Sequence, residues 1–155
     1  MKRFGTEYGG FYYPENLDGL DSNSIIYCVG AGEDISHDIV LAKKLDSNIY
    51  IIDPTPRAIQ HCSYVRNVLD GKDKPIYNNR FGGGNPFDYW KIILDNTIDS
   101  NKIIYNNSGL GIEDSIQKLY LSSNEEYLNC SLVKEIKEEK YINIDVKKLK
   151  TLMKY

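Results

Sequence analysis

The stretch from Ser24 to Pro56 constrains the fold more than any other part of the chain. An apolar run at 25–29 leads into Gly30-Ala31-Gly32, and a second apolar run at 49–52 ends on Asp53. Apolar runs of this length, bounded by turn residues, are typical of buried strands. Between them the apolar residues recur at helical spacing. The stretch therefore predicts a strand, a glycine turn, a helix and a second strand, which together form a βαβ unit.

The helix of this unit is predicted to begin near residue 35. Its apolar positions fall on one face of a helix, at Ile35, Ile39, Ala42 and Leu45. Asp34 or Ser36 would cap its first turn. A second helix is predicted from Pro56 to about Leu69, with Thr55 as its N-cap.

The predicted geometry of the unit suggests a ligand. In an open parallel sheet, ligands bind at the carboxyl ends of the strands. Gly30 and Gly32 carry no Cβ, so they let a ligand approach the backbone closely. Asp53 ends the second strand, where an acid is placed to accept the hydroxyls of a ribose. These residues predict a ligand that contains a nucleoside.

The residues after Gly32 favour one nucleoside over another. A dinucleotide fingerprint would have a third glycine where this chain has Ile35. Glu33 and Asp34 follow Gly32 instead, and two acids near a helix N-terminus repel a pyrophosphate and suit a cation. S-adenosylmethionine has an adenosine, a sulfonium and an α-amino group. We therefore predict S-adenosylmethionine as the cofactor, and a nucleotide-dependent oxidoreductase is the weaker alternative.

Several segments of the chain resemble a known family. The runs KRFGTEYGGFYYPENL, SIIYCVGAGEDISHDIVLAKKL and IYIIDPTPRAIQH are similar to the amino-terminal half of FkbM-type S-adenosylmethionine-dependent methyltransferases. NNSGLGIEDSIQKLYL resembles the third strand and following hairpin of that family, and INIDVKKLKTLMK resembles the segment that leads to its fourth strand. The resemblance covers almost the whole chain and is most specific in its first third.

The resemblance implies a class I methyltransferase fold, an α/β Rossmann-like arrangement. It places Gly30 and Gly32 in the cofactor loop and Asp53 on the ribose. It also implies that the segment from Glu7 to Gly10, which includes Tyr8, lies near the methionine end. By the same matching, Ser108 and Gly109 lie near the adenine, together with Leu110.

The end of the chain departs from the family pattern. A segment similar to KKLKTLMK leads in the family to a strand with a DxEGAE-like motif, whereas this sequence stops at Tyr155. We therefore expect an incomplete sheet and a truncated relative of the family. An edge strand left without a neighbour invites pairing with a second copy, so a homodimer through that edge is also expected.

Length predicts a single domain over residues 1–155. We divide it into an N-terminal strap at 1–22, the βαβ cofactor unit at 23–70, and a part at 71–155 with the third strand, a hairpin and a C-terminal helix. In this last part, strands are predicted at 102–106, 117–122, 129–133 and 141–146. The final helix carries an apolar stripe of Val146, Leu149, Leu152 and Met153. The glycine-rich residues 80–86 are interpreted as a connector rather than a phosphate loop.

Composition and charge limit the classes of partner that we expect this chain to bind. The 19 basic and 22 acidic residues give a formal charge of −3, which argues against a nucleic-acid partner. The three cysteines are widely spaced, so the sequence predicts neither a disulfide framework nor a metal site. No apolar stretch is long enough for a membrane span, and we expect a cytoplasmic protein.

His37 and His61 are interpreted as surface or hydrogen-bonded structural residues, with His37 capping its helix or facing solvent.

The sequence leaves two main hypotheses for function. The first is a methyltransferase that acts on an oxygen of a sugar or another small-molecule acceptor. The second is a non-catalytic remnant that serves as a nucleoside-binding or interaction module. No residue of the sequence stands out as a general base, so the catalytic residues remain unassigned.

Overall fold

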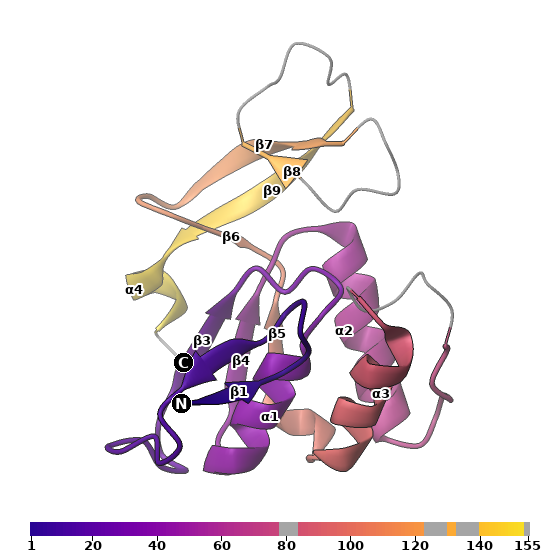
Figure 1. Ribbon diagram of the computed structural model, residues 1–155. Coiled ribbons are helices and arrows are strands. Elements are labelled where there is room, and N and C mark those ends of the chain that lie inside the picture. Colours follow the sequence, from indigo (N-terminus) through magenta and orange to yellow (C-terminus); the bar gives the residue numbers. More distant parts are fainter. Residues whose placement is uncertain (78–83, 123–129, 133–139, 154–155) are drawn as a thin grey trace.

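The computed structural model describes residues 1–77, 84–122, 130–132 and 140–153 (Figure 1). Its elements form a mixed α/β fold, as the sequence predicts. They comprise a short N-terminal hairpin, a three-stranded parallel sheet with helices, and a second sheet built from the later part of the chain.

The parallel sheet consists of β3 (Ile26–Val29), β4 (Ile49–Ile52) and β5 (Ile103–Asn106). β4 lies in the middle and pairs in parallel with both neighbours. These strands confirm the apolar runs predicted at 25–29, 49–52 and 102–106. Their carboxyl ends therefore meet at one edge of the sheet, where Val29 is level with Ile52 and Asn106.

Three helices cover one face of this sheet, namely α1 (Ser36–Leu45), α2 (Pro56–Leu69) and α3 (Pro86–Asp95). A short 3-10 turn, Ser100–Lys102, precedes β5. The main core lies between the helices and the sheet, and β3 contributes the partly buried Ile26 and Cys28. The other two strands and the three helices contribute fully buried side chains: Ile39, Ile51, Val65, Trp90, Ile93 and Ile103. The predicted start of α2 is confirmed, because the Thr55 side chain accepts a hydrogen bond from the Ala58 amide.

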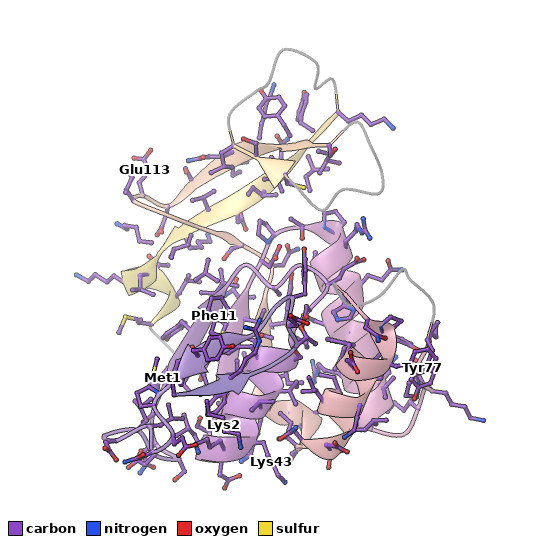
Figure 2. All side chains as sticks on the ribbon, in the orientation of Figure 1. Met1, Lys2, Phe11, Lys43, Tyr77 and Glu113 are labelled. Carbon is purple, nitrogen blue, oxygen red and sulfur yellow. The ribbon has the colours of Figure 1, made fainter. Side chains whose placement is uncertain are left out.

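The N-terminal strap forms a hairpin of β1 (Lys2–Phe4) and β2 (Phe11–Tyr13). Phe4 is almost fully buried in the main core, and β1 packs against α1. In contrast, Phe11 and Tyr12 are mostly exposed (Figure 2). Phe4 therefore anchors the first strand of the strap in the core beside the first helix.

The second sheet has the strand order β6-β9-β7-β8. Its strands are β6 (Gly109–Gly111), β7 (Ser115–Leu121), β8 (Cys130–Ser131) and β9 (Tyr141–Lys148). β7 and β9 form a long antiparallel pair and confirm the strands predicted at 117–122 and 141–146, and β8 pairs with β7 inside the strand predicted at 129–133. A small core of Leu119, Ile144 and Val146 lies beneath them.

The last helix is much shorter than predicted. The sequence predicted a strand at 141–146 and a final helix whose apolar stripe includes Val146, but β9 continues to Lys148 and α4 spans only Leu149–Leu152. Val146 stays in the strand because it has a neighbour on each side, Gly109 in β6 and Ser115 in β7. Backbone pairing and 1% exposure at Val146 outweigh the helical spacing of the apolar residues.

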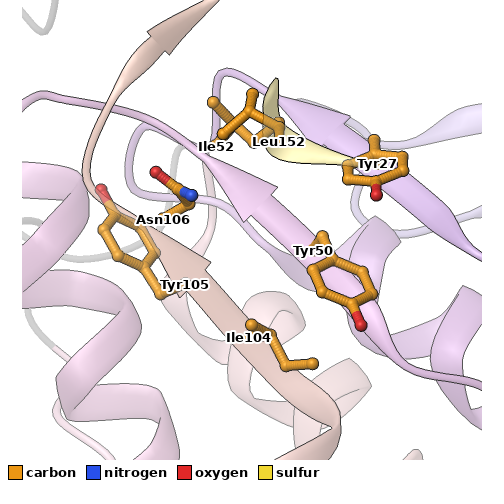
Figure 3. Close-up of a pocket in the computed structure, with 7 residues that line it drawn as sticks. All are labelled: Tyr27, Tyr50, Ile52, Ile104, Tyr105, Asn106 and Leu152. Atoms are coloured by element: carbon orange, nitrogen blue, oxygen red, sulfur yellow. The ribbon is translucent and has the colours of Figure 1, made fainter. Parts of the chain in front are cut away.

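The face of the parallel sheet opposite the helices carries a hollow of about 390 Å³ (Figure 3). Tyr27, Tyr50 and Ile104 lie side by side across it at one register level. Leu152 of α4 reaches this face and is buried, so one member of the predicted apolar stripe packs back onto the sheet. Leu149 and Met153 remain exposed.

Some predicted segments lie outside the described residues, including most of the glycine-rich stretch 80–86. Among the helices that the structure describes, none has both the length and the apolar character that crossing a membrane requires.

His61 lies inside the helical layer, hydrogen-bonded to a tyrosine. Its Nε2 lies 2.6 Å from the Tyr89 hydroxyl, and both side chains are fully buried. The structure thus confirms the prediction of a hydrogen-bonded structural histidine. Burial lowers the pKa of His61 to about 4, because a charged imidazolium is costly to bury.

We predict that His61 makes the fold sensitive to acid. The unfolded chain takes up this proton near the ordinary imidazole pKa of 6.5, whereas the folded chain does so only near 4. The stabilisation is present above pH 6.5 and is lost as the pH falls towards 4. In urea unfolding across this range, His61→Gln should lose less stability than the wild-type chain. Equal pH slopes for the two proteins would contradict this prediction.

Candidate functional site

A hollow of about 340 Å³ lies at the carboxyl ends of β3 and β4. Its walls come from the glycine loop after β3, the turn after β4, the turn after β5 and the second sheet. The residues that line it are Val29, Gly30, Ile52, Asp53, Pro54, Thr55, Ser108, Gly109, Leu110, Leu119 and Cys130. Of the predicted cofactor residues, this hollow brings together Gly30, Asp53, Ser108 and Gly109.

The glycine loop follows β3 directly and needs glycine for conformational reasons. Gly30 and Gly32 have φ values of +83° and +53°, a region that favours glycine. The amide of Gly30 donates to the carbonyl of Ile52 at 2.9 Å, which ties the loop to the end of β4. A Cβ at Gly30 would meet no atom within 4 Å, so the backbone here borders open space.

The Asp53 carboxylate holds the loops around the hollow together. Its Oδ2 accepts hydrogen bonds from the amides of Ala31 and Gly32 at 2.8 and 3.0 Å. Its Oδ1 accepts from the amide and hydroxyl of Thr55 at 2.8 and 2.7 Å. The carboxylate is 5% exposed, and these contacts use its full acceptor capacity. A ribose hydroxyl would have to replace one of them to bind Asp53.

The two acids after Gly32 also have partners within the protein. Glu33 forms a two-pronged ion pair with Arg57 of α2, at 2.9 and 2.6 Å. Asp34 accepts a hydrogen bond from the Ser36 amide at 2.9 Å and another from the Thr6 hydroxyl of the strap. Neither side chain lines the hollow. The pair predicted to face a cation instead fastens the loop to α2 and to the strap.

The structure refines the start of α1. The helix begins at Ser36, and the residue in the capping position is Ile35, which has no side chain able to cap. The Asp34 carboxylate binds the Ser36 amide and so performs part of the capping role that the sequence assigned to it. Ile35 is completely buried, which explains why an apolar residue occupies that position.

Tyr8 and Gly10 lie in the turn of the strap and not in the lining of the hollow. Tyr8 is 67% exposed. The amide of Gly10 donates to the Thr6 carbonyl at 2.9 Å, and a Cβ at Gly10 would lie 2.4 Å from that oxygen. Gly10 is therefore required for a tight turn, and Thr6 links that turn to Asp34.

Ser108 and Gly109 connect β5 to β6 along one wall of the hollow. Ser108 is 2% exposed, and its hydroxyl donates to the Asn106 side-chain oxygen at 2.7 Å. Gly109 begins β6 and pairs with Val146. The wall near the predicted adenine position is thus rigid, and its polar groups are largely engaged in the turn itself.

The residues that line the hollow are suited to binding a ligand. Asp53 is its one carboxylate among the residues that the structure places there, and its oxygens are all engaged. Ile52, Leu110 and Leu119 supply apolar surface for a flat ring. The described lining contains no histidine, lysine or glutamate to act as a general base.

Comparisons with protein family models, curated proteins and solved structures find no match.

The sequence analysis missed a group of polar side chains beneath the glycine loop. His37 neither caps α1 nor faces solvent, because it is buried against Tyr13 of the strap. Beside it lie Asp38 of the same helix and Cys28 of β3. The sequence indicates only that a strand and the following helix of a βαβ unit face each other. Which of their residues meet is decided only by packing.

We predict that Asp53→Ala destabilises the fold. The substitution leaves the Ala31 and Gly32 amides without their carboxylate partner and removes a bond that orients Thr55 at the start of α2. A loss of about 1 to 3 kcal/mol in the free energy of unfolding is expected for removing a buried charged acceptor.

Asp99→Ala is the matched control, because exposed Asp99 accepts only the Asn101 amide in a surface turn. Urea unfolding of both variants measures the difference. A loss no larger for Asp53→Ala than for Asp99→Ala would show that Asp53 does not hold the loops together.

Proposed function

We propose that this chain binds S-adenosylmethionine and is a Rossmann-like relative of class I methyltransferases. The observation that carries the proposal is the hollow beyond Gly30 and Asp53, at the carboxyl ends of parallel strands. That is the place where open parallel sheets bind ligands. The order β3-α1-β4-α2-β5, with a glycine turn after β3, supports the same proposal.

The hollow suits a nucleoside in size and in the character of its walls. Its volume of about 340 Å³ lies within the usual range for small-molecule sites, about 300 to 1,000 Å³. Gly30 leaves room at one end, and Ile52, Leu110 and Leu119 offer apolar surface to an adenine. Thr55 and Ser108 supply the hydroxyl groups of the lining.

The ion pair of Glu33 and Arg57 sets the charge near the end of the site where the sulfonium and amino group of the cofactor would lie. A cationic sulfonium or amino group near Glu33 would compete with Arg57, whose guanidinium is partly exposed. Asp34 is held more firmly, because it is buried and bonded to two elements. Of the two acids, Glu33 is therefore the one we propose to respond to the cofactor.

Bound S-adenosylmethionine would supply an electrophilic methyl group for in-line displacement. The residues of this chain would orient the cofactor and exclude water from it, which is the main task of such a site. We propose a small-molecule acceptor, with an oxygen of a sugar as the favoured class and no nucleic-acid partner. The two hypotheses differ in whether the chain transfers the methyl group to this acceptor.

A nucleoside-binding module without catalysis is the second candidate. The observation that favours it is the described lining of the hollow, which offers no general base for an oxygen acceptor. A dinucleotide-dependent oxidoreductase is disfavoured, because Ile35 is fully buried where the fingerprint requires glycine.

We predict that the intact chain binds S-adenosylhomocysteine and that Leu110→Trp weakens this binding at least about tenfold. An indole at Leu110, which lines the hollow, would occupy space that the nucleoside needs. A tenfold change is about 1.4 kcal/mol in binding free energy. Isothermal titration calorimetry measures it.

Ile112→Trp is the control, because Ile112 is 97% exposed just beyond β6 and outside the hollow. Its affinity should match that of the intact chain. A folded intact chain that gives no binding heat would refute cofactor binding. Equal affinities for all three proteins would place the ligand elsewhere.

We also propose that the chain forms a homodimer through the free edge of β3. Within the three described strands, β3 lies at one edge, and Ile25 and Val29 at its ends are 60% and 55% exposed. Exposed apolar edge strands favour pairing with another chain.

A cytoplasmic location is proposed as well, since Cys28 and Cys62 carry thiols.

Ile25→Lys should shift the protein towards monomer, because a charge beside an edge strand opposes pairing. Ile116→Lys is the control, since Ile116 is 74% exposed in the second sheet. Sedimentation velocity at several concentrations tests both variants. A wild-type chain that remains monomeric at high concentration would refute the dimer.

A further inference from the structure

Cys28, His37 and Asp38 form a compact group beneath the glycine loop. One ligand atom from each residue, namely a thiol sulfur, an imidazole nitrogen and a carboxylate oxygen, lies within 4.8 Å of the other two. Asp38 and His37 are buried at 6% and 8% exposure, and Cys28 is half-buried. Among the described residues, this is the one group of three such side chains gathered so closely.

The βαβ unit brings these residues together. Cys28 lies on the side of β3 that packs against the helical core. His37 and Asp38 belong to the first turn of α1, immediately after the glycine loop. The group therefore joins the strand before the loop to the helix after it. Because both elements are regular and packed, the three side chains have a fixed relation to one another.

The ring of His37 is held in an orientation that suits a ligand. Its Nε2 lies 2.8 Å from the Tyr13 hydroxyl, and the two rings are stacked with a 10° angle between their planes. Phe11 packs against the same ring edge-on. The other nitrogen, Nδ1, is left facing Asp38 at 4.0 Å. Histidines that bind metals usually have such a partner on the second nitrogen.

Asp38 has little compensation for its charge. Among the described residues, His37 is the one basic side chain within 4.0 Å of it. The Cys28 sulfur lies beside the carboxylate, and Asp34 adds further negative charge nearby. Buried carboxylates are normally paired with a cation or bound to a metal. The surroundings of Asp38 therefore suit a positive ion at the centre of the group.

We propose that Cys28, His37 and Asp38 bind one zinc ion, with water in the fourth position. Sulfur, nitrogen and carboxylate oxygen are the ligands that zinc takes in proteins, and a thiolate disfavours magnesium and calcium. Zinc bonds of about 2.0 to 2.3 Å bring ligand atoms within about 4 Å of each other. The group therefore needs only a slight contraction, by rotation of side chains that already face one another.

Binding breaks the S–H bond of Cys28 and forms a Zn–S bond. The displaced proton passes to the solvent, and one oxygen of the Asp38 carboxylate binds the metal. Zinc would join the end of β3 to the start of α1 and so fix the glycine loop between them. This site is independent of cofactor binding in the hollow, since none of its three residues lines that hollow.

The first experiment titrates the intact chain with Co²⁺, which substitutes for zinc and absorbs light. A thiolate ligand gives a charge-transfer band in the near ultraviolet, and the titration should saturate at one ion per chain. Cys28→Ala should abolish the band. Cys62→Ala is the matched control, because Cys62 is also buried but lies on α2 outside the group, and it should keep the band.

Zinc affinity itself is then measured by competition with a coloured chelator. Asp38→Asn keeps the side-chain shape and His37→Gln replaces the ring with a neutral polar side chain of similar length. Each should weaken binding at least about tenfold. Tyr13→Phe removes the hydroxyl beside Nε2 and should weaken binding about 10- to 100-fold, the usual effect of losing such a partner. Circular dichroism establishes that each variant is folded.

A folded intact chain without the cobalt band would overturn the proposal. It would also be overturned if the band were lost in Cys62→Ala and kept in Cys28→Ala. If Cys28→Ala does not fold, the decision rests on His37→Gln and Asp38→Asn, and unchanged zinc affinity in both would refute the site.

Discussion

The hydrogen bonds of the Asp53 carboxylate are the interaction on which the rest of the structure around the hollow depends. One oxygen holds the glycine loop after β3, and the other holds the turn that begins α2. Tyr105 of β5 adds a hydrogen bond to the Asp53 carbonyl. Three consecutive strands of the sheet are therefore connected at their carboxyl ends through one residue.

Glu33 and Asp34 extend the same principle to the neighbouring elements. Through Arg57 the first connects the loop to α2, and through Thr6 the second connects it to the strap. Acidic residues near a glycine loop are often interpreted as ligand contacts. Here, their first role is to hold the loop in place. A bound ligand would act on a loop that is already ordered, which lowers the entropic cost of binding.

The two faces of the parallel sheet differ in what covers them. Helices α1, α2 and α3 bury one face, whereas the other carries the hollow beside Tyr27 and Tyr50, with Leu152 packed over it. Parallel sheets are usually covered on both faces. The metal site that we propose belongs to the helical face, and the cofactor site that we propose lies at the strand ends. The two sites therefore meet only at the glycine loop.

Sequence alone determined the elements whose signal is local. The strands ending at Val29 and Ile52, the glycine turn and the Thr55 cap were predicted correctly, because a short apolar run, a positive φ and an N-cap each depend on a few adjacent residues. Tertiary structure decided what depends on partners distant in the chain. Val146 was predicted both at the end of a strand and on the helical stripe, and it stayed in the strand because β6 and β7 pair with it on both sides.

The same distinction holds for the candidate site. Gly30, Asp53, Ser108 and Gly109 were assigned to one site from the sequence, and they line one hollow because parallel strands bring their ends together. Tyr8, Gly10, Glu33 and Asp34 were assigned to the cofactor, but the fold places them outside the lining of the hollow. The meeting of Cys28 with His37 and Asp38 was not visible in the sequence. It depends on how α1 rotates against β3, and only the packing of the whole core determines that rotation.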